Sequence, residues 1–219
     1  IYRGYWMINW FKNEFGHKEV EMSKKTGVSP ERQFDEMIQH IPPGSMGLTL
    51  QPYWSPGVRI PGVEAKGAII GFGDVHTRAH IYKAILEGLT YSLKQGTLRT
   101  QKRTGIKVRK LRVSGGGSQS EHAMQMTADI FNLKVEKPHT YETSALGAAI
   151  NCAVGLKLYP DFETAIENMC HIEKEYTPNP YNAAIYHQLY KKVYRKMYRR
   201  LKPIYHSIRQ IINYPKMQH

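Results

Sequence analysis

The sequence predicts an α/β protein with a mixed sheet and flanking helices. Short apolar stretches that suit strands alternate along the chain with longer stretches of helical periodicity. Clusters of glycine and proline separate the two kinds of segment. The chain has 219 residues, of which 41% are hydrophobic, and this is enough for a full core in one large domain or two small ones.

Two helices are expected before the first strand. Residues 2–16 carry large apolar side chains at mixed spacing, which predicts a helix buried on most of its circumference. Ser29 and Pro30 suit the N-cap and the first position of a second helix, whose apolar face begins at Phe34. Proline and glycine at 42–44 end that helix.

The middle of the chain predicts two strands and one long helix. Residues 47–54 and 68–72 are strand-like, and the second of these reads as a buried strand. The helix runs from Thr77 to about Arg103 and contains Gly88 and Gly96. Glycine costs about 1 kcal/mol inside a helix, so we expect close packing at both positions.

The second half repeats the alternation of strands and helices. Pro203 lies inside the last helix and is expected to kink it. The expected strands are 107–113 and 133–137, and the expected helices are 119–131, 143–154, 161–170 and 180–212.

Composition indicates a cytoplasmic protein. No segment approaches the roughly 18 apolar residues that a membrane span requires, and the first thirty residues lack the pattern of a secretory signal. Two cysteines are too few for a disulfide framework. The chain starts with isoleucine rather than methionine, and its first residues resemble the middle of a longer sequence, so we expect a fragment.

Residues 113–131 read VSGGGSQSEHAMQMTADIF, a strand end followed by three glycines and a helix. A strand, a glycine loop and a helix N-terminus can present backbone N–H groups to an anion such as a phosphate. The same cluster can simply form a tight turn, and its spacing matches neither a P-loop nor a dinucleotide-binding motif. The residues alone leave both interpretations open.

Three ordered segments resemble the C-terminal half of the FGGY carbohydrate kinases, which are sugar and polyol kinases. They are GAIIGFGDVHTRAHIYKAILEGL (67–89), VSGGGSQSEHAMQMTADIFNLKVEKP (113–138) and ETSALGAAINCAVGL (142–156). The resemblance covers roughly residues 1–180 and leans toward the xylulokinase-like branch. It implies a ribonuclease H-like fold of the actin-like ATPase superfamily. Residues 1–219 would then form the C-terminal ATP-binding domain, with 180–219 as a basic C-terminal helix.

The resemblance also implies a nucleotide site. In this family ATP binds between two domains, and the glycine loop of the second domain lies against the adenosine and the inner phosphates. Glycine lets the backbone approach the ligand closely. The residues implied to bind ATP are Gly115, Gly116, Gly117, Ser118, Ser120 and, on the first helix, Asn9.

The resemblance places the remaining parts of the reaction in an N-terminal domain. These parts are the catalytic aspartate, most of the Mg²⁺ site and most of the sugar pocket, so we expect this chain alone to be inactive. It also implies that strands preceding Ile1 belong to the sheet. An open sheet edge would pair with the missing half or with a second copy in a homodimer.

The C-terminal helix supports a second interpretation. No acidic residue follows Glu175, and tyrosines recur every four residues among the lysines and arginines of 186–209. A basic helix with aromatic residues could bind nucleic acid or another anion. We favour the alternative that the tyrosines pack on the domain and the cations form its solvated face. Nucleic acid is therefore not the expected partner.

Overall fold

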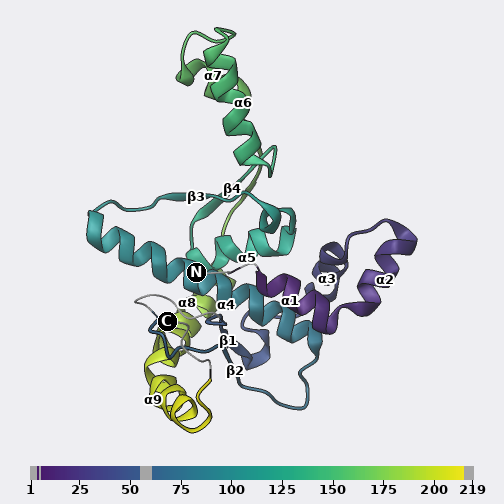
Figure 1. Ribbon diagram of the computed structural model, residues 1–219, viewed down its shortest axis with the longest axis vertical. Coiled ribbons are helices and arrows are strands. Elements are labelled where there is room, and N and C mark those ends of the chain that lie inside the picture. Colours follow the sequence, from purple (N-terminus) through teal and green to yellow (C-terminus); the bar gives the residue numbers. More distant parts are fainter. Residues whose placement is uncertain (1–3, 5, 55–60, 215–219) are drawn as a thin grey trace.

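A computed structural model describes residues 4, 6–54 and 61–214. The long helix α4 (Arg78–Thr104) crosses the middle of the molecule, and most other elements pack around it (Figure 1). Three N-terminal helices lie toward one end of α4, and the C-terminal helices lie below it in this view. Helices α6 and α7 project at the top as a separate arm.

The order of elements follows the predicted alternation. The N-terminal helices are α1 (Trp6–Phe15), α2 (His17–Thr26) and α3 (Pro30–Ile38). The strands are β1 (Thr49–Gln51), β2 (Ala68–Ile70), β3 (Lys110–Arg112), β4 (Lys134–Pro138) and β5 (Ile172–Tyr176). The later helices are α5 (Glu121–Phe131), α6 (Thr143–Gly155), α7 (Phe162–Met169), α8 (Pro180–Leu189) and α9 (Arg195–Ile212).

The strands form two separate sheets. β1 and β2 pair antiparallel, with Leu50 opposite Ile69. In the second sheet β4 is the central strand and pairs parallel with β3 and antiparallel with β5. The predicted mixed sheet is thus confirmed for β3–β4–β5, whereas the two strands before α4 belong to a sheet of their own.

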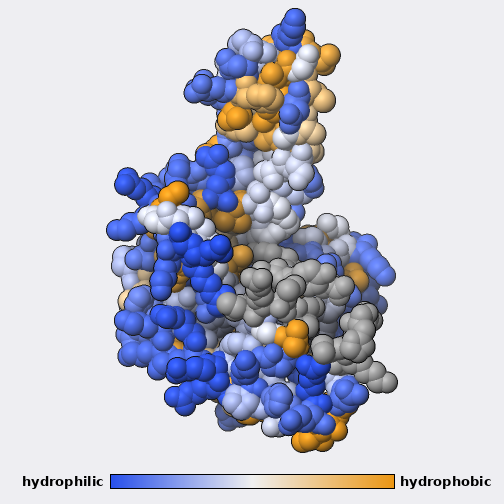
Figure 2. Space-filling view, turned by 60° about the vertical axis from the view of Figure 1, so that its left-hand side comes forward, coloured by the Kyte–Doolittle hydropathy of each residue, from blue (hydrophilic) through white to orange (hydrophobic). Residues whose placement is uncertain are grey.

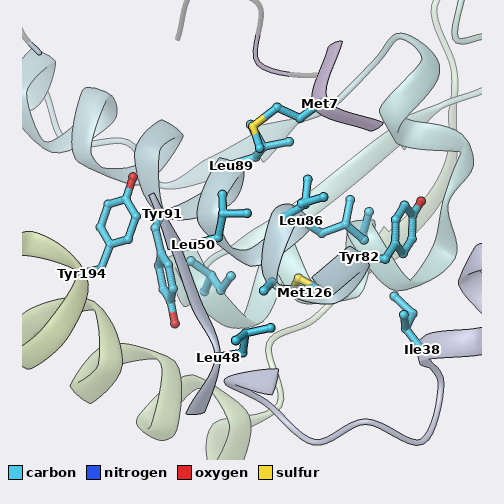
Figure 3. Packing of buried hydrophobic residues seen from close by; sticks show 14 of the residues in the cluster. Met7, Ile38, Leu48, Leu50, Tyr82, Leu86, Leu89, Tyr91, Met126 and Tyr194 are labelled. Carbon is cyan, nitrogen blue, oxygen red and sulfur yellow. The ribbon is translucent and has the colours of Figure 1, made fainter. Parts of the chain in front are cut away.

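The main core surrounds α4. Side chains from α1, α3, α5 and β1 gather on this helix, and Met7, Ile38, Leu50 and Met126 are among those that Figure 3 shows. Each fully buried side chain of this size contributes about 1.5–3 kcal/mol. A smaller cluster between α5 and the β3–β4–β5 sheet includes Val135.

Two N-terminal expectations need correction. The helix expected over residues 2–16 starts at Trp6 in the described part, and it buries only Met7 and Phe11 rather than most of its circumference. The Trp6 side chain is 43% exposed. The strand expected to be buried, β2, is also partly exposed, since it lies at the edge of a two-stranded sheet.

Other local predictions hold. The Ser29 hydroxyl accepts a hydrogen bond from the Arg32 N–H at 3.3 Å and so caps α3.

Helix α2 and strand β5 were not predicted, because their sequences have no strong apolar periodicity. Residues 55–60, between the two strands expected before the long helix, lie outside the described residues.

The C-terminal tyrosines pack inward, as expected. Tyr186, Tyr190 and Tyr194 are buried, and all three rings contact Tyr91 of α4. A π-helical turn over Tyr190–Tyr194 joins α8 to α9. The tyrosines that could have stacked on nucleic-acid bases are therefore part of the core, and the lysines and arginines around them face solvent.

Gly88 and Gly96 differ in their surroundings. A Cβ atom at Gly88 would lie 2.4 Å from the Leu50 carbonyl oxygen, so this glycine permits α4 to approach β1 closely. At Gly96 a Cβ atom would meet nothing within 4 Å, so the expectation of close packing there was wrong.

This difference predicts opposite effects of one substitution. Gly88→Ala is expected to lower the free energy of unfolding by about 1–3 kcal/mol, because the new methyl group meets rigid backbone. Gly96→Ala is expected to raise it by up to about 1 kcal/mol through helix propensity. Urea unfolding of both variants checks the prediction, and equal effects would contradict it.

No helix in the described part of the chain combines the length and the apolar character that crossing a membrane requires.

Candidate nucleotide-binding site

The glycine loop lies where β3, α5 and α6 meet. It follows the carboxyl end of β3 and leads into the N-terminus of α5. The Gly115 N–H donates to the Tyr141 carbonyl at 3.1 Å, and the hydroxyls of Ser114 and Thr143 are 3.1 Å apart. The loop is thereby joined to the start of α6. In α/β folds, ligands bind at the carboxyl ends of parallel strands, and β3 and β4 are parallel.

The loop conformation depends on glycine. Gly115 has φ of +85°, which side chains with a Cβ atom rarely adopt. A 3₁₀ turn over Gly116–Gln119 follows it. Ser118 is buried and closes this turn, since its N–H and its hydroxyl both donate to the Gly115 carbonyl, at 3.0 and 2.8 Å.

The outer side of the loop is open. A Cβ atom at Gly115 or Gly116 would meet no other atom within 4 Å. Within the part of the chain that the structure describes, the N–H groups of Gly116 and Gly117 have no protein acceptor. Two unpaired backbone donors beside open space form an arrangement that can bind an anion.

Ser120 links the loop to α3. Its hydroxyl oxygen accepts from the Ala123 N–H at 2.9 Å, which caps α5, and the hydroxyl donates to Asp35 Oδ1 at 2.7 Å. Burial raises the pKa of the Asp35 carboxyl, and the hydrogen bond from Ser120 opposes this rise. In this structure the hydroxyls of Ser118 and Ser120 are engaged within the protein, and their contact with a nucleotide stays a prediction.

The predicted residue Asn9 is not brought into this cluster. It is exposed on α1, and among the described residues no hydrogen bond joins it to the loop. Its role therefore stays a prediction as well.

Asp35 was not predicted as part of the site. It lies 85 positions before Ser120, and no short motif spans that distance. The available signal was an acidic residue directly after Phe34 on the apolar face of α3. A carboxylate in such a position requires a hydrogen-bond partner from another element.

The residues at the loop do not form a Mg²⁺ site. Asp35 accepts from Ser120, and Glu121 forms ion pairs with Lys137 and Lys174. Among residues 4, 6–54 and 61–214, no group of three or more His, Cys, Asp and Glu side chains is arranged to hold a metal.

Removing the Ser120 hydroxyl should destabilise the loop and α5 together. Ser120→Ala is expected to lower the free energy of unfolding by about 1–2 kcal/mol, because the cap and the partner of Asp35 are both lost. The loss should be larger at pH 7 than at pH 4, since the hydrogen bond favours the ionised carboxylate of Asp35. Thermal unfolding at both pH values measures this, and Ser120→Thr serves as a control that keeps the hydroxyl. A loss that is the same at both pH values would contradict this role of Asp35.

Comparison with known proteins identifies the family. Residues 6–156 match the family described as the FGGY family of carbohydrate kinases, C-terminal domain. This chain belongs to the FGGY family of carbohydrate kinases. The matched region contains the complete glycine loop, α5 and α6.

Relatives of this FGGY chain are named as sugar kinases. It is 33% identical over 186 residues to the uncharacterized sugar kinase YgcE of Escherichia coli K12, covering 85% of this chain and 37% of the relative. It is 34% identical over 188 residues to xylulose kinase of Lactococcus lactis, covering 83% of this chain and 35% of that enzyme. The chain therefore spans little more than a third of these relatives.

Solved structures confirm the fold of this FGGY chain. Xylulose kinase from Rhodospirillum rubrum superimposes with a TM-score of 0.70 at 24% identity, covering 90% of this chain and 38% of that protein. Plasmodium falciparum glycerol kinase with ADP gives a TM-score of 0.64 at 21% identity, covering 83% of this chain and 36% of that protein. The predicted ribonuclease H-like, actin-like α/β fold is thus confirmed.

Proposed function

We propose that this chain is the nucleotide-binding part of an ATP-dependent carbohydrate kinase and that its glycine loop binds ATP. The observation that carries the proposal is that, among the described residues, the N–H groups of Gly116 and Gly117 have no protein acceptor, with open space at the Cβ position of Gly116. Backbone donors of this kind suit phosphate oxygens. The FGGY membership of the chain supports ATP as the phosphate compound.

The proposed reaction is transfer of the γ-phosphoryl group of ATP to a hydroxyl of a small sugar or polyol. The chain would hold and orient the nucleotide. In phosphoryl transfer, positioning of the reactants and stabilisation of charge together supply most of the catalysis. We place the catalytic aspartate, most ligands of Mg²⁺ and the sugar pocket outside residues 1–219. Relatives that are xylulose kinases and a gluconokinase support a sugar or sugar acid as the acceptor.

The glycine loop can be tested with the chain as it is. Titration with a fluorescent ATP analogue should give saturable binding that unlabelled ATP reverses. The same preparation, incubated with Mg-ATP and xylulose, should release no ADP above the background. Absence of nucleotide binding would contradict the proposed site, and sugar-dependent release of ADP would contradict the assignment of the catalytic groups to another region.

Nucleic-acid binding is not proposed. Tyr186, Tyr190 and Tyr194 are buried, so they offer no ring to a base. The exposed cations of α9 alone would give only charge-driven binding, whose affinity falls steeply with salt. Duplex DNA titrated at low and at physiological salt distinguishes such binding from a specific site.

A further inference from the structure

Helix α9 leaves part of its apolar face uncovered. The helix buries Met197 and Tyr205 against the rest of the domain. Ile204, Ile208 and Ile211 follow one another at intervals of four and three residues, which places them on one face of the helix. Ile204 and Ile211 are nevertheless 53% and 81% exposed.

The end of α9 adds two more exposed apolar side chains. Ile212 is 59% exposed and Tyr214 is 65% exposed. Figure 2 shows hydrophobic side chains beside hydrophilic ones at the lower end of the molecule, where Figure 1 places α9. An apolar patch with a polar rim marks a surface that binds a partner. We call Ile204, Ile208, Ile211, Ile212 and Tyr214 the α9 patch.

Cations surround the α9 patch. Helix α9 contains six lysines and arginines, and the sequence has no acidic residue after Glu175. The ammonium group of Lys66 adds a further positive charge, since it donates to the Tyr214 carbonyl at 2.9 Å and lies 5.0 Å from the centre of the Tyr214 ring. Glu64 lies beside the helix and pairs with Lys202 at 3.4 Å. Among the described residues, the other five cations of α9 form no ion pair.

A membrane surface with anionic lipids matches both the charge and the apolar character of the α9 patch. Amphipathic helices with lysine and arginine on one side and large apolar residues on the other lie at the boundary between headgroups and acyl chains. A second copy of the chain would bring cations against cations. Nucleic acid would match the charge only, because its bases stack on aromatic rings and the patch is mainly aliphatic.

We infer that the α9 patch binds the surface of membranes that contain anionic lipids. The isoleucines would enter the boundary of the acyl chains, and the long side chains of lysine and arginine would reach the headgroups. Such binding is peripheral and requires no helix that spans the membrane. The family match ends at residue 156, so α9 lies outside the matched region. The inference goes beyond the proposed kinase function and does not depend on nucleotide binding at the glycine loop.

Sedimentation with vesicles tests the inference on the chain as it is. Vesicles of phosphatidylcholine and phosphatidylglycerol in equal parts supply anionic headgroups, and vesicles of phosphatidylcholine alone supply none. We expect the chain to sediment with the anionic vesicles and to stay in solution with the neutral ones. Salt screens the cations, so the affinity should fall at least threefold between low and physiological salt.

A triple variant removes apolar character from the patch without changing its charge. Ile204→Gln, Ile211→Gln and Ile212→Gln together are expected to weaken binding to the anionic vesicles at least tenfold. All three side chains are more than half exposed, so circular dichroism and the melting temperature should stay those of the wild type.

The matched control changes three equally exposed residues outside α9 to glutamine. Ile106, Leu156 and Leu158 are 71%, 73% and 71% exposed. This control should bind the anionic vesicles as tightly as the wild type does. An equal loss in the control and in the triple variant would contradict a specific role of the α9 patch.

Three further results would overturn the inference. The first is failure of the wild type to sediment with the anionic vesicles at low salt. The second is equal binding of the wild type and the triple variant, because charge alone would then account for it. The third is a homodimer of the chain that the triple variant abolishes, which would assign the patch to a second copy. Titration of the triple variant with the fluorescent ATP analogue is a separate readout, so failure of the membrane contact and failure of the proposed ATP site are distinguishable.

Discussion

Glu87→Ala is expected to lower the free energy of unfolding by about 3 kcal/mol or more. Glu87 is 3% exposed in the middle of α4. Its carboxylate accepts hydrogen bonds from the Gly44 N–H at 2.8 Å, the Ser45 hydroxyl at 2.9 Å and the Tyr186 hydroxyl at 2.8 Å. Alanine would leave all three donors buried without an acceptor, and each such donor costs about 1–3 kcal/mol.

The carboxylate also holds an unusual backbone segment. Four consecutive residues, from Gly44 to Gly47, have φ of +83°, +48°, +54° and +100°. Two of them, Ser45 and Met46, are not glycine, and a left-handed conformation of such residues costs about 1–2 kcal/mol each. Bonds from Glu87 to this turn and to α8 oppose that cost. Loss of the carboxylate should therefore release the turn.

Glu87→Gln is the matched control. Its carbonyl oxygen can accept from Gly44 and Tyr186, and its amide can donate to the Ser45 hydroxyl, so most of the stability should be kept. Burial raises the pKa of Glu87 above its ordinary value near 4.5. The folded state then binds the proton more tightly than the unfolded state, so the contribution of Glu87 falls as the pH rises from about 4.5 through the folded-state pKa.

Urea unfolding between pH 4 and pH 7 checks both statements. As the pH rises, the free energy of unfolding of Glu87→Gln should increase relative to that of the wild type, because glutamine has no proton to lose. Glu87→Ala should be strongly destabilised throughout. Equal stability of the alanine and glutamine variants, or a difference that is independent of pH, would contradict this account of Glu87.

Gly116→Arg should weaken ATP binding at least tenfold, or about 1.4 kcal/mol. Gly116 lies outside the left-handed region and has open space at its Cβ position, so the loop can accept a side chain without strain. The arginine side chain would then occupy the volume in which the nucleotide is proposed to bind. This position is a cleaner test than Gly115, whose positive φ makes any substitution strained.

Gly96→Arg provides the control for charge. It adds the same cation at an exposed glycine of α4 that likewise has nothing within 4 Å of its Cβ position. Its affinity for the fluorescent ATP analogue should equal that of the wild type. Similar affinities of Gly116→Arg and the wild type would exclude the glycine loop as the binding site.

Local patterns predicted much of this fold. The N-cap Ser29 followed by Pro30, the spacing of apolar residues in α4 and the strand–glycine–helix order at 113–131 all correspond to observed elements. These signals are short-range, since capping and periodicity depend on neighbours within one or two turns. The three ordered motifs also identified the family, which a single glycine loop does not.

Contacts between segments far apart in the sequence could not be predicted from such local patterns. The pairing of Ser120 with Asp35, the link between Glu87 and Tyr186 and the isolation of the α6–α7 arm each depend on how distant segments meet. Burial of α1 and β2 was overestimated for the same reason, because apolar composition shows what a segment can bury and not what covers it. The candidate site was predicted as residues of the glycine loop together with Asn9 of the first helix, and the bond from Ser120 to Asp35 of α3 was not predicted.

ATP is proposed to bind to the backbone of the glycine loop. Two-dimensional ¹H–¹⁵N spectra of the chain, recorded during titration with ATP, test it most directly. We expect the amide signals of Gly116 and Gly117 to shift first and most, with a binding curve equal to that of the fluorescent analogue. Saturable ATP binding that leaves these two signals in place and instead shifts the amide signals of lysines and arginines in α9 would contradict binding at the glycine loop.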